Sequence, residues 1–499
     1  MIRKLLIANR GEIAVRIIRA AREMGIRTVA VYSDADANAI HTGLADESSA
    51  LGGNTPAESY LDIKKIIAAA ISLGVDAIHP GYGFLSERAE FSEACANAGI
   101  IFVGPPASAM RLLGSKSAAK SIAVQESVPI VPGLFDVSAT NEQLCAAAVA
   151  IGYPVMLKAS AGGGGRGMRI VRDPAIFHEE LHTASDEAEK AFGDGKMMVE
   201  KLVERPRHIE VQLLADQHGN VACLFERECS LQRRHQKLLE EAPSPYLSDH
   251  PKMWKEMCEA SRRLAKASGY VGAGTVEFMV DEAEGKFYFL EVNTRLQVEH
   301  PVTEFVSGVD LVKWQLRIAS GEKLTLASSL MAGDRKAICG HSMEVRIVAE
   351  DPAKGFMPSI GTILGWAEPK GPGIRVDTGF GVNAEVTRFY DSLIAKVICH
   401  SDSRQGVIQR MRFALLDFHI LGVTTNIGYM LDVLDHPDFG LGQIDTGFLG
   451  REFAEWGQAE LPPELGSIVS VAEHTASRHV SATNVRSVWD EADGFRNAG

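Results

Sequence analysis

The 499-residue sequence lacks the patterns of a secreted, zinc-binding or membrane-spanning protein. Its seven cysteines are scattered, with no C-x-x-C pair and no histidine cluster at zinc spacing, so we expect reduced, mostly buried thiols. The apolar run at residues 5–8 is too short for a signal peptide, and no apolar stretch approaches the ~20 residues that span a bilayer. These absences predict a soluble, cytoplasmic protein without a membrane partner.

Positive charge is also scarce. The formal net charge of −13 argues against a nucleic-acid partner, because such proteins carry net positive surface that replaces counterions on phosphate. Local basic residues therefore more plausibly serve a small anionic ligand. The 46% hydrophobic content supports several buried cores, and the length favours about three or four domains of roughly 150 residues each.

The first hundred residues alternate short apolar strands with amphipathic helices. Strands are expected at residues 4–8, 28–32, 77–78 and 100–103, with a helix at 12–24, and this rhythm predicts a parallel α/β sheet. The first turn, Asn9-Arg10-Gly11-Glu12, contains a single glycine where a dinucleotide fold would carry three. A dinucleotide site is therefore not expected.

Two further regions follow. A helix at 116–125 and a hairpin-like pair of strands at 153–160 and 168–171 suggest a small lobe inserted in a larger one. An apolar helix at 309–318 leads to strand-like alternation at 342–348 and 374–397, which predicts a mixed α+β unit ending near Phe453. Residues 460–499 show no sustained apolar period, as is typical of a linker or tail.

A glycine-rich run occupies residues 161–167, between the two strands of the small lobe. Its backbone could approach a polyphosphate closely, and Lys116 and Lys158 could contact the phosphates as point charges. It is not a P-loop, because it enters a strand at Met168 and not a helix. The alternative is a surface hairpin whose glycines serve only the turn.

A second hairpin carries two glutamates. Strands at 275–280 and 286–292 flank a turn at 281–285, and in that register Glu277 lies opposite Glu291. Two like charges about 5 Å apart destabilise a sheet unless a cation bridges them, and carboxylates are how Mg²⁺ is usually held. The alternative is an exposed hairpin with two hydrated carboxylates.

Polar residues alternate with apolar ones beyond this hairpin. If the chain stays extended, one face carries Glu291, Asn293, Arg295, Gln297 and Glu299, although a plain exposed strand would share the pattern. Metal ligands, an anion-binding arginine, an amide and a potential base in sequence favour a reaction site. A basic stretch at 232–237 adds His235 and Lys237 as candidates for phosphate or bicarbonate contacts.

Five motifs in order, at residues 9–14, 79–87, 158–168, 291–301 and 388–396, resemble the biotin carboxylase family of ATP-grasp enzymes. The resemblance covers residues 1 to about 450. It implies a multidomain α/β and α+β fold. The implied parts are a preATP-grasp, Rossmann-like domain at 1–114, an ATP-grasp domain at 115–330 with a lid at about 131–203, a biotin carboxylase C-terminal domain at 331–453, and a linker or tail at 454–499.

The resemblance also implies an activity, the ATP- and bicarbonate-dependent carboxylation of biotin through carboxyphosphate. It implies ATP, two ions of Mg²⁺ or Mn²⁺, and biotin as a carrier-bound substrate. No Met-Lys-Met biotin attachment site occurs, so the biotin is expected on a carboxyl carrier protein or on another part of a longer polypeptide. A carboxyltransferase subunit and a homodimer or larger carboxylase complex are the other implied partners.

Roles follow from the same resemblance, residue by residue. The ATP-binding set is Lys116, Lys158, Gly163, Gly164, Gly165, Glu200, Lys201, His208, Gln232, His235 and Glu277. The metal ligands are Glu277, Glu291 and Asn293. Bicarbonate is bound by Lys237, Arg295, Gln297 and the backbone of Val298; Glu299 is the general base; and Arg346 stabilises the biotin enolate.

Two other functions stay open. A biotin-independent ATP-grasp ligase acting on bicarbonate, such as a carbamoyl-phosphate-synthase-like enzyme, shares the fold and the activation of bicarbonate. Arg346 and the segment at 388–392 favour the carboxylase over it. A non-catalytic ATP-binding subunit would keep the glycine run and lose the base, whereas Glu299 and Arg295 are both present.

Overall fold

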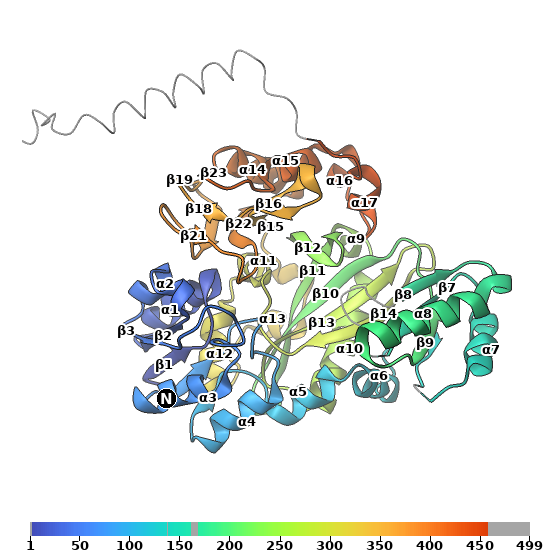
Figure 1. The fold of residues 1–499 in the computed structure, drawn as a ribbon, viewed down its shortest axis with the longest axis horizontal. Coiled ribbons are helices and arrows are strands. Elements are labelled where there is room, and N and C mark those ends of the chain that lie inside the picture. Colours follow the sequence, from blue (N-terminus) through green and yellow to red (C-terminus); the bar gives the residue numbers. More distant parts are fainter. Residues whose placement is uncertain (1, 137, 161–167, 458–499) are drawn as a thin grey trace, which may run out of the picture. The chain divides into compact units, whose positions relative to one another are not determined.

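The computed structural model describes residues 2–136, 138–160 and 168–457. Met1–Glu455 form one compact unit, and Trp456–Gly499 form a second, of which only residues 456 and 457 are described. All elements named below belong to the first unit (Figure 1). The linker or tail expected at 454–499 lies almost wholly outside the described residues, as does the glycine run at 161–167 with Gly163, Gly164 and Gly165.

The N-terminal region is a parallel five-stranded sheet, as its sequence rhythm predicts. The strand order is β3-β2-β1-β4-β5, and every pairing in it is parallel. Its central strand β1 is buried on both faces, which explains its continuous apolar run. The elements are β1 (Lys4–Ile7), α1 (Gly11–Glu23), β2 (Arg27–Tyr32), α2 (Ile40–Leu44), β3 (Glu47–Ala50), α3 (Ile63–Ser72), β4 (Ala77–His79), α4 (Ala89–Asn97) and β5 (Ile101–Phe102).

The small lobe is an antiparallel four-stranded sheet packed against two helices. Its strand order is β6-β9-β7-β8, and Lys158 pairs with Met168 in the predicted hairpin-like pair. Val155 and Leu157 of the sheet share a core with Leu144 and Phe177 of the helices. The elements are β6 (Gly133–Leu134), α7 (Asn141–Ile151), β7 (Val155–Ala159), β8 (Met168–Val171), α8 (Phe177–Phe192) and β9 (Met197–Lys201).

The largest sheet is antiparallel and has eight strands in the order β14-β13-β10-β11-β12-β15-β22-β20. It crosses residue 330, so the strands expected in a third unit extend the central sheet (Figure 1). The strands are β10 (Arg207–Ala215), β11 (Val221–Arg233), β12 (Gln236–Ala242), β13 (Gly272–Asp281), β14 (Lys286–Asn293), β15 (His341–Val348), β20 (Ile374–Thr378) and β22 (Leu393–Ser401).

The two faces of this sheet differ in chemistry. Val276, Phe278 and Val280 of β13 face an apolar core shared with the helices α5 (Ala107–Gly114), α6 (Lys116–Gln125) and α10 (Pro251–Ala267). Because side chains alternate along a strand, Thr275 and Glu277 point to the opposite face. α11 (His300–Ser307) and α12 (Leu311–Ala319) follow β14 in the chain. The structure thereby decides which face of the hairpin is the apolar one.

The remaining elements complete the C-terminal part. α14 contacts β15 and β22, and three two-stranded sheets, β16-β17, β18-β21 and β19-β23, lie in the same part of the chain. No described helix is long and apolar enough to cross a membrane. The elements are α9 (Pro245–Ser248), α13 (Ser328–Ala332), β16 (Glu350–Asp351), β17 (Met357–Pro358), β18 (Gly361–Thr362), β19 (Gly365–Ala367), β21 (Glu385–Val386), α14 (Arg404–Leu416), β23 (His419–Leu421), α15 (Ile427–Asp435), α16 (Pro437–Gly440) and α17 (Phe448–Glu452).

The extended face predicted for residues 291–299 is wrong. β14 ends at Asn293, and residues 294–299 form a bend and a turn that lead into α11. The backbone N–H of Thr294 donates to the Glu87 carboxylate, 3.1 Å away, and not to a neighbouring strand. Pro301 lies in the first turn of α11, where its fixed φ favours a helix start. The polar residues converge through this loop and not along one strand face.

The cysteine expectation is confirmed. All seven thiols are free, and five of them are buried, at Cys95, Cys223, Cys229, Cys258 and Cys399.

Candidate active site

A cavity of about 1250 Å³ lies over the polar face of the central sheet. Its walls come from the N-terminal region, the small lobe, the central sheet and residues 346–393. Most of the residues predicted from the sequence line it: Lys116, Lys158, Glu200, His208, Gln232, His235, Lys237, Glu277, Glu291, Asn293, Arg295, Gln297, Val298, Glu299 and Arg346. Of the described residues in the predicted set, Lys201 alone is not part of the lining.

The small lobe supplies one end of the cavity. Glu200 on β9 is buried and forms ion pairs with Lys158 on β7 and, at 3.6 Å, with Lys120 on α6. Lys201 is the next residue of the same strand, so its side chain points to the other face, where it pairs with Glu284. The strand alternation therefore brings Glu200 to the cavity and takes the Lys201 side chain away from it.

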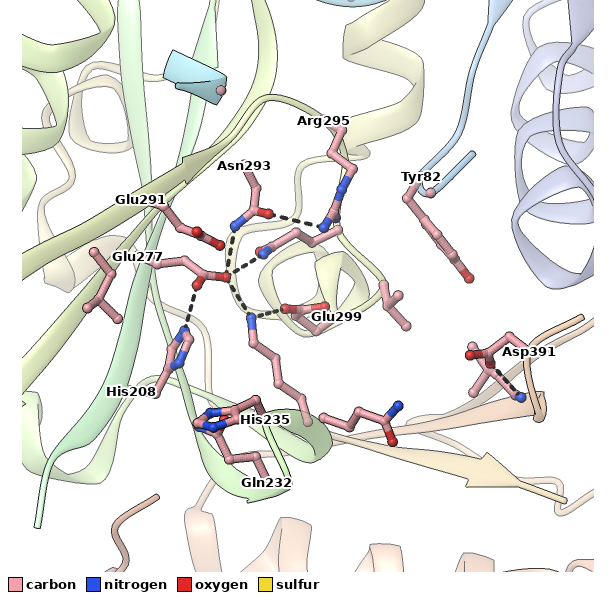
Figure 2. Close-up of a pocket in the computed structure, with 18 of the residues that line it drawn as sticks. Tyr82, His208, Gln232, His235, Glu277, Glu291, Asn293, Arg295, Glu299 and Asp391 are labelled. Carbon is pink, nitrogen blue, oxygen red and sulfur yellow. Dashed lines mark hydrogen bonds and ion pairs between the residues drawn. The ribbon is translucent and has the colours of Figure 1, made fainter. Parts of the chain in front are cut away.

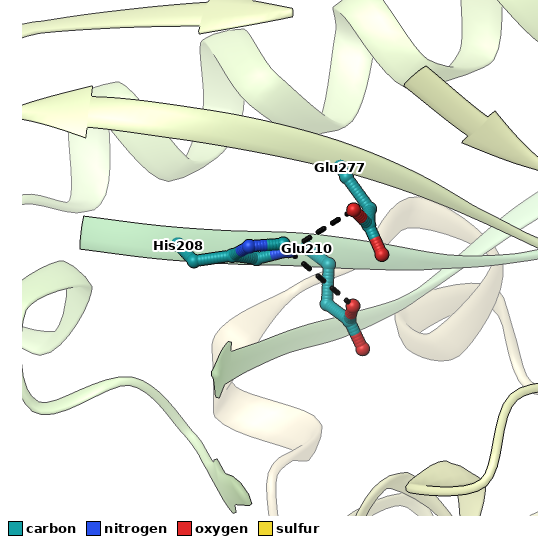
Figure 3. Close-up of side chains that lie close together, drawn as sticks. All are labelled: His208, Glu210 and Glu277. Atoms are coloured by element: carbon teal, nitrogen blue, oxygen red, sulfur yellow. Dashed lines mark ion pairs between the residues drawn. The ribbon is translucent and has the colours of Figure 1, made fainter. Parts of the chain in front are cut away.

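A buried cluster of His208, Glu210 and Glu277 forms where β10 pairs with β13 (Figure 3). His208 Nε2 lies 3.2 Å from Glu277 Oε2 and 4.0 Å from the Glu210 carboxylate. Burial lowers the pKa of His208, but the Glu277 carboxylate outweighs it, and the pKa lies above its ordinary value. The raised pKa favours the protonated, positively charged form of an imidazole that lines the cavity.

Glu277 and Glu291 pair directly across β13 and β14, as predicted. The register shifts between Glu277 and Phe278, because Leu290 is the extra residue of a β-bulge, so the pairing depends on an irregularity that the sequence did not reveal. Glu277 Oε1 accepts from Lys237 Nζ at 3.0 Å, Asn293 Nδ2 at 2.8 Å and Gln297 Nε2 at 3.0 Å. Although burial opposes it, Lys237 holds the pKa of Glu277 well below its ordinary value.

Glu291 differs from its neighbour. Within residues 2–136, 138–160 and 168–457 it has no hydrogen-bond or ion-pair partner, and desolvation and the nearby charge of Glu277 raise its pKa. The negative charge of Glu291 is therefore largely unbalanced. Together with the Glu277 carboxylate and the Asn293 amide, it forms the set of hard oxygen donors that suits Mg²⁺ or Mn²⁺. The residues present therefore fit a divalent cation.

Lys237 lies at the centre of three carboxylates. Its ammonium group donates to Glu210 at 2.7 Å, Glu277 at 3.0 Å and Glu299 at 2.7 Å. Burial lowers its pKa, but the three glutamates outweigh burial and raise the pKa well above its ordinary value. Lys237 is therefore a fixed cation at neutral pH.

Glu299 lies between two cations. One oxygen accepts from Lys237, and the other accepts from Arg346 Nη2 at 2.8 Å. Burial would raise the pKa of Glu299, but Lys237 and Arg346 together hold it well below its ordinary value. Arg346 also donates through Nε to Glu240 at 2.7 Å, and burial raises the pKa of Glu240 to about 7. Glu299 is thus an ionised carboxylate with both oxygens engaged.

Arg295 is held at the edge of the loop that follows β14. It donates to Glu87 at 3.1 Å, to Asn293 Oδ1 at 3.1 Å and to the Leu296 carbonyl at 3.2 Å. The Val298 carbonyl accepts from Lys396 Nζ at 2.7 Å. Figure 2 shows Tyr82 and Asp391 set apart from Glu277 and Glu291, so the cavity has two chemically different ends.

Several residues of the site were not predicted from the sequence. Tyr82 lines the cavity and donates to Glu12 at 2.5 Å, and Glu12 pairs with the buried Lys396 at 3.1 Å. Glu12, Tyr82, Glu87 and Lys396 all lie within the recognised motifs, and that was the available signal. Glu210 and Glu240 lie on ordinary strands outside those motifs, and only the sheet register reveals them.

Three family models match successive parts of the chain. Residues 1–110 match the biotin carboxylase N-terminal domain, residues 115–327 the ATP binding domain of the carbamoyl-phosphate synthase L chain, and residues 344–451 the biotin carboxylase C-terminal domain.

Curated relatives are similar over most of the chain. It is 50% identical to a biotin carboxylase of a Nostoc species, over 89% of this chain and 98% of that protein. It is 49% identical to the mitochondrial methylcrotonoyl-CoA carboxylase subunit alpha of Mus musculus, over 90% of this chain. The match spans 62% of the length of that longer subunit.

Solved structures share the fold. The biotin carboxylase domain of Hydrogenobacter thermophilus 2-oxoglutarate carboxylase, a dimer in complex with MgADP, ADP and bicarbonate, has a TM-score of 0.84 at 45% identity, over 92% of this chain and 100% of that chain. A biotin carboxylase from Campylobacter jejuni, in complex with β,γ-ATP, has a TM-score of 0.84 at 44% identity, over 91% of this chain and 99% of that chain.

Proposed function

The chain belongs to the biotin carboxylase family, and on that premise we propose that it catalyses the ATP- and bicarbonate-dependent carboxylation of biotin. The observation that carries the proposal is the placement of Glu299 between Lys237 and Arg346. A base, an anion-binding cation and an arginine meet at one point of the cavity, which is what proton transfer from bicarbonate and stabilisation of a developing oxyanion require.

ATP is assigned to the end of the cavity formed by the small lobe and the hairpin of β13 and β14. Lys116 and Lys158 supply positive charge for phosphates, and Glu200 holds Lys158 in place. The raised pKa of His208 favours its protonated form, which would add to that charge. Glu277, Glu291 and Asn293 would hold Mg²⁺ or Mn²⁺, which neutralises phosphate charge and orients the transferred group. Lys201 contributes no side chain to this end.

Bicarbonate is assigned to the donors around Glu299. Lys237, Arg295 and the Gln297 amide all line the cavity and can donate to an anion. An anion that accepts a hydrogen bond from Lys237 competes with Glu299 for that cation. Lys237 is one of the two cations that keep Glu299 weakly basic. Binding of the substrate would therefore raise the basicity of Glu299 when a proton must be taken.

Biotin is assigned to the end of the cavity beside Arg346 and Tyr82. Arg346 is a fixed cation, because Glu240 and Glu299 outweigh burial and raise its pKa. Its guanidinium can stabilise the negative charge that develops on the ureido oxygen of biotin as the ring nitrogen is carboxylated.

We propose that biotin is presented on a carboxyl carrier and that the carboxyl group passes to a separate carboxyltransferase. The names of the longer relatives, which are acyl-CoA carboxylase subunits, support this arrangement, and the dimer of the Hydrogenobacter domain supports a homodimer. Seven free thiols support a reducing compartment such as the cytoplasm.

The test is ADP release by the purified chain in the presence of bicarbonate, with and without free biotin. The proposal predicts turnover that requires bicarbonate and is stimulated by biotin. Turnover that ignores biotin contradicts it, and stimulation by ammonia in place of biotin favours the carbamoyl-phosphate-synthase-like ligase. The second outcome is worth measuring because the family model over residues 115–327 bears that enzyme's name.

A further inference from the structure

We infer that Arg227, a buried residue outside the cavity, is the positioning residue that fixes the bicarbonate-binding groups. The inference rests on the proposed function, because it assigns a cause to the geometry of Gln297 and Lys237. Arg227 lies on β11, its side chain is fully buried, and it is not among the cavity-lining residues.

All three guanidinium nitrogens of Arg227 are engaged. Nε donates to Glu210 Oε1, Nη1 to Gln212 Oε1 at 2.6 Å and Thr303 Oγ1 at 2.9 Å, and Nη2 to Thr275 Oγ1 at 3.0 Å and Gln297 Oε1 at 2.7 Å. A guanidinium carries five N–H donors, so its hydrogen-bonding capacity is filled. The five acceptors come from β10, β13, α11 and the loop after β14.

The contact to Gln297 sets the orientation of its amide. Because Gln297 Oε1 accepts from Arg227, its Nε2 is turned the other way and donates to Glu277 at 3.0 Å. In the flipped orientation the NH₂ group of Gln297 would face the N–H donors of Arg227. Two donors cannot form a hydrogen bond with each other, so the flipped amide is excluded. Arg227 therefore ensures that Gln297 presents a donor, and not an acceptor, on the side of the cavity.

The contact to Glu210 sets the position of Lys237. The two oxygens of Glu210 are divided, with Oε1 accepting from Arg227 and Oε2 from Lys237 at 2.7 Å. Glu210 is fully buried, so without Arg227 its charge would be balanced mainly by Lys237, with the His208 imidazole more distant at 4.0 Å. We expect Lys237 to move toward Glu210 in that case and away from Glu299.

Lysine cannot replace this arrangement. An ammonium group has three donors at one atom, whereas the planar guanidinium reaches acceptors on four separate elements at once. Of the five acceptors only Gln297 lines the cavity, and it belongs to the donors assigned to bicarbonate. Arg227→Lys should thus affect bicarbonate more than ATP.

The test compares the steady-state kinetics of Arg227→Lys with those of wild type, with bicarbonate and ATP varied in turn. We expect the KM for bicarbonate to rise ~10-fold or more and the KM for ATP to change less than ~2-fold. Arg404→Lys is the matched control, since Arg404 also makes several hydrogen bonds from a largely buried site, to Glu241, Phe439 and Gly440, none of which lines the cavity. It should lower thermal stability without changing the KM for bicarbonate.

A second variant covers the case in which Arg227→Lys does not fold. Thr275→Val with Thr303→Val keeps the side-chain volumes, retains the arginine and removes two of its five acceptors. We expect the KM for bicarbonate to rise by ~3-fold with the KM for ATP unchanged. Equal rises in both KM values, or no change in either, would overturn the inference.

A double-mutant cycle with Gln297→Ala separates positioning from general destabilisation. If Arg227 acts through Gln297, the effects of the two substitutions on kcat/KM for bicarbonate are less than additive, whereas independent effects add. Additive effects contradict the inference. A wild-type chain that releases ADP without any need for bicarbonate overturns the proposed function instead, and that result is seen before any variant is made.

Discussion

Glu299 is ionised at rest because Lys237 and Arg346 each hold one of its oxygens. The same contacts make it a weak base. Under the proposed function, an anion that competes for Lys237 would raise the basicity of Glu299, so that charge balance would link substrate binding to base strength at a single residue. The pKa of the nearby Glu277 is also lowered, chiefly by Lys237, and three donors converge on one of its oxygens, which makes it a poor proton acceptor.

Glu299→Gln tests the base directly. The amide keeps the shape of the side chain and cannot accept a proton, so we expect kcat to fall by ~10²–10⁴-fold. ADP binding, measured by calorimetry, should be retained because Glu299 lies away from the small lobe. Glu241→Gln is the control, since Glu241 is equally buried and pairs with Arg404 outside the cavity. Full activity of Glu299→Gln would contradict the role of base.

His79 gives a prediction about pH. Its ring accepts from the Gly81 N–H through Nδ1 and contacts Gln315 through Nε2, and burial lowers its pKa to about 4 from 6.5. Between these values the unfolded chain binds the proton more readily, so the stability due to neutral His79 is present above about pH 6.5 and is lost as pH falls through about 4.

Thermal unfolding of His79→Gln at about pH 5 and about pH 7.5 checks that sign. We expect a smaller drop in melting temperature on acidification than in wild type, although the variant starts lower at neutral pH. His218→Gln, at an exposed position, should keep the wild-type drop. A steeper drop for His79→Gln would show that His79 is protonated in the folded protein.

At the scale of elements, the hairpin of β11 and β12 places Lys237. Its turn consists of Arg234 and His235, both with positive φ, at 49° and 65°. Two-residue hairpins favour this left-handed backbone, but non-glycine residues are strained in it. The turn pairs Gln232 with Lys237 and brings both to the cavity. The strained backbone of Arg234 and His235 therefore belongs to the turn that positions Lys237.

Arg234→Gly should relieve part of that strain. Glycine adopts positive φ without a Cβ clash, and the Arg234 side chain is exposed, so we expect a gain of about 1 kcal/mol in stability. Arg234→Ala is the matched control, because it removes the same side chain and keeps the Cβ. Denaturant unfolding should show a gain for glycine only. An equal gain for alanine would place the effect in the side chain and not in the backbone.

The elements that the sequence predicted best were those whose burial shows in a local pattern. The strands around β1 are apolar because a parallel sheet is covered on both faces, and the helix predicted to begin near residues 114–116 and to run through Gln125 is observed as α6. The pairing of Glu277 with Glu291 was also predicted, but it holds only through the bulge at Leu290. The extended strand predicted through Glu299 was wrong. The Thr294 N–H donates to Glu87, more than 200 residues away in sequence, and not to a neighbouring strand.

Local sequence patterns could not predict the buried residues that support the site. Arg227, Glu210 and Lys396 act through partners on other strands, and those partners depend on the register of β10 with β11 and β13. A single sequence gives the residue types but not this long-range register. Lys396 was quoted within a motif, yet nothing local indicates that its ammonium group reaches Glu12 and the Val298 carbonyl.

At the scale of the molecule, Lys396 connects three distant parts of the chain. It is fully buried on β22, donates to the Val298 carbonyl at 2.7 Å, and pairs with Glu12 on α1 at 3.1 Å and with Asp377 on β20 at 3.8 Å. Glu12 in turn accepts from Tyr82 at the cavity. The N-terminal region, the loop after β14 and the C-terminal strands are therefore held by one cation.

Lys396→Met should destabilise the protein by about 3–5 kcal/mol, because Glu12 would keep a buried charge without its cation, whereas Asp377 would keep Arg375. Lys354→Met is the control, since Lys354 is exposed and pairs with Asp351 at the surface, where no measurable change is expected. Both are measured by denaturant unfolding of the whole chain. Equal stabilities of the two variants would show that the buried network does not support the fold.

The most direct test of the central claim follows the carboxyl group itself. The purified chain is incubated with ATP, Mg²⁺, free biotin and [¹⁴C]bicarbonate, and acid-labile label on biotin is measured. We predict label that requires ATP and rises with biotin, and that is lost in Arg346→Ala, because Arg346 is the cavity-lining cation that we propose stabilises the charge developing on biotin. ADP release without any label on biotin would contradict the account.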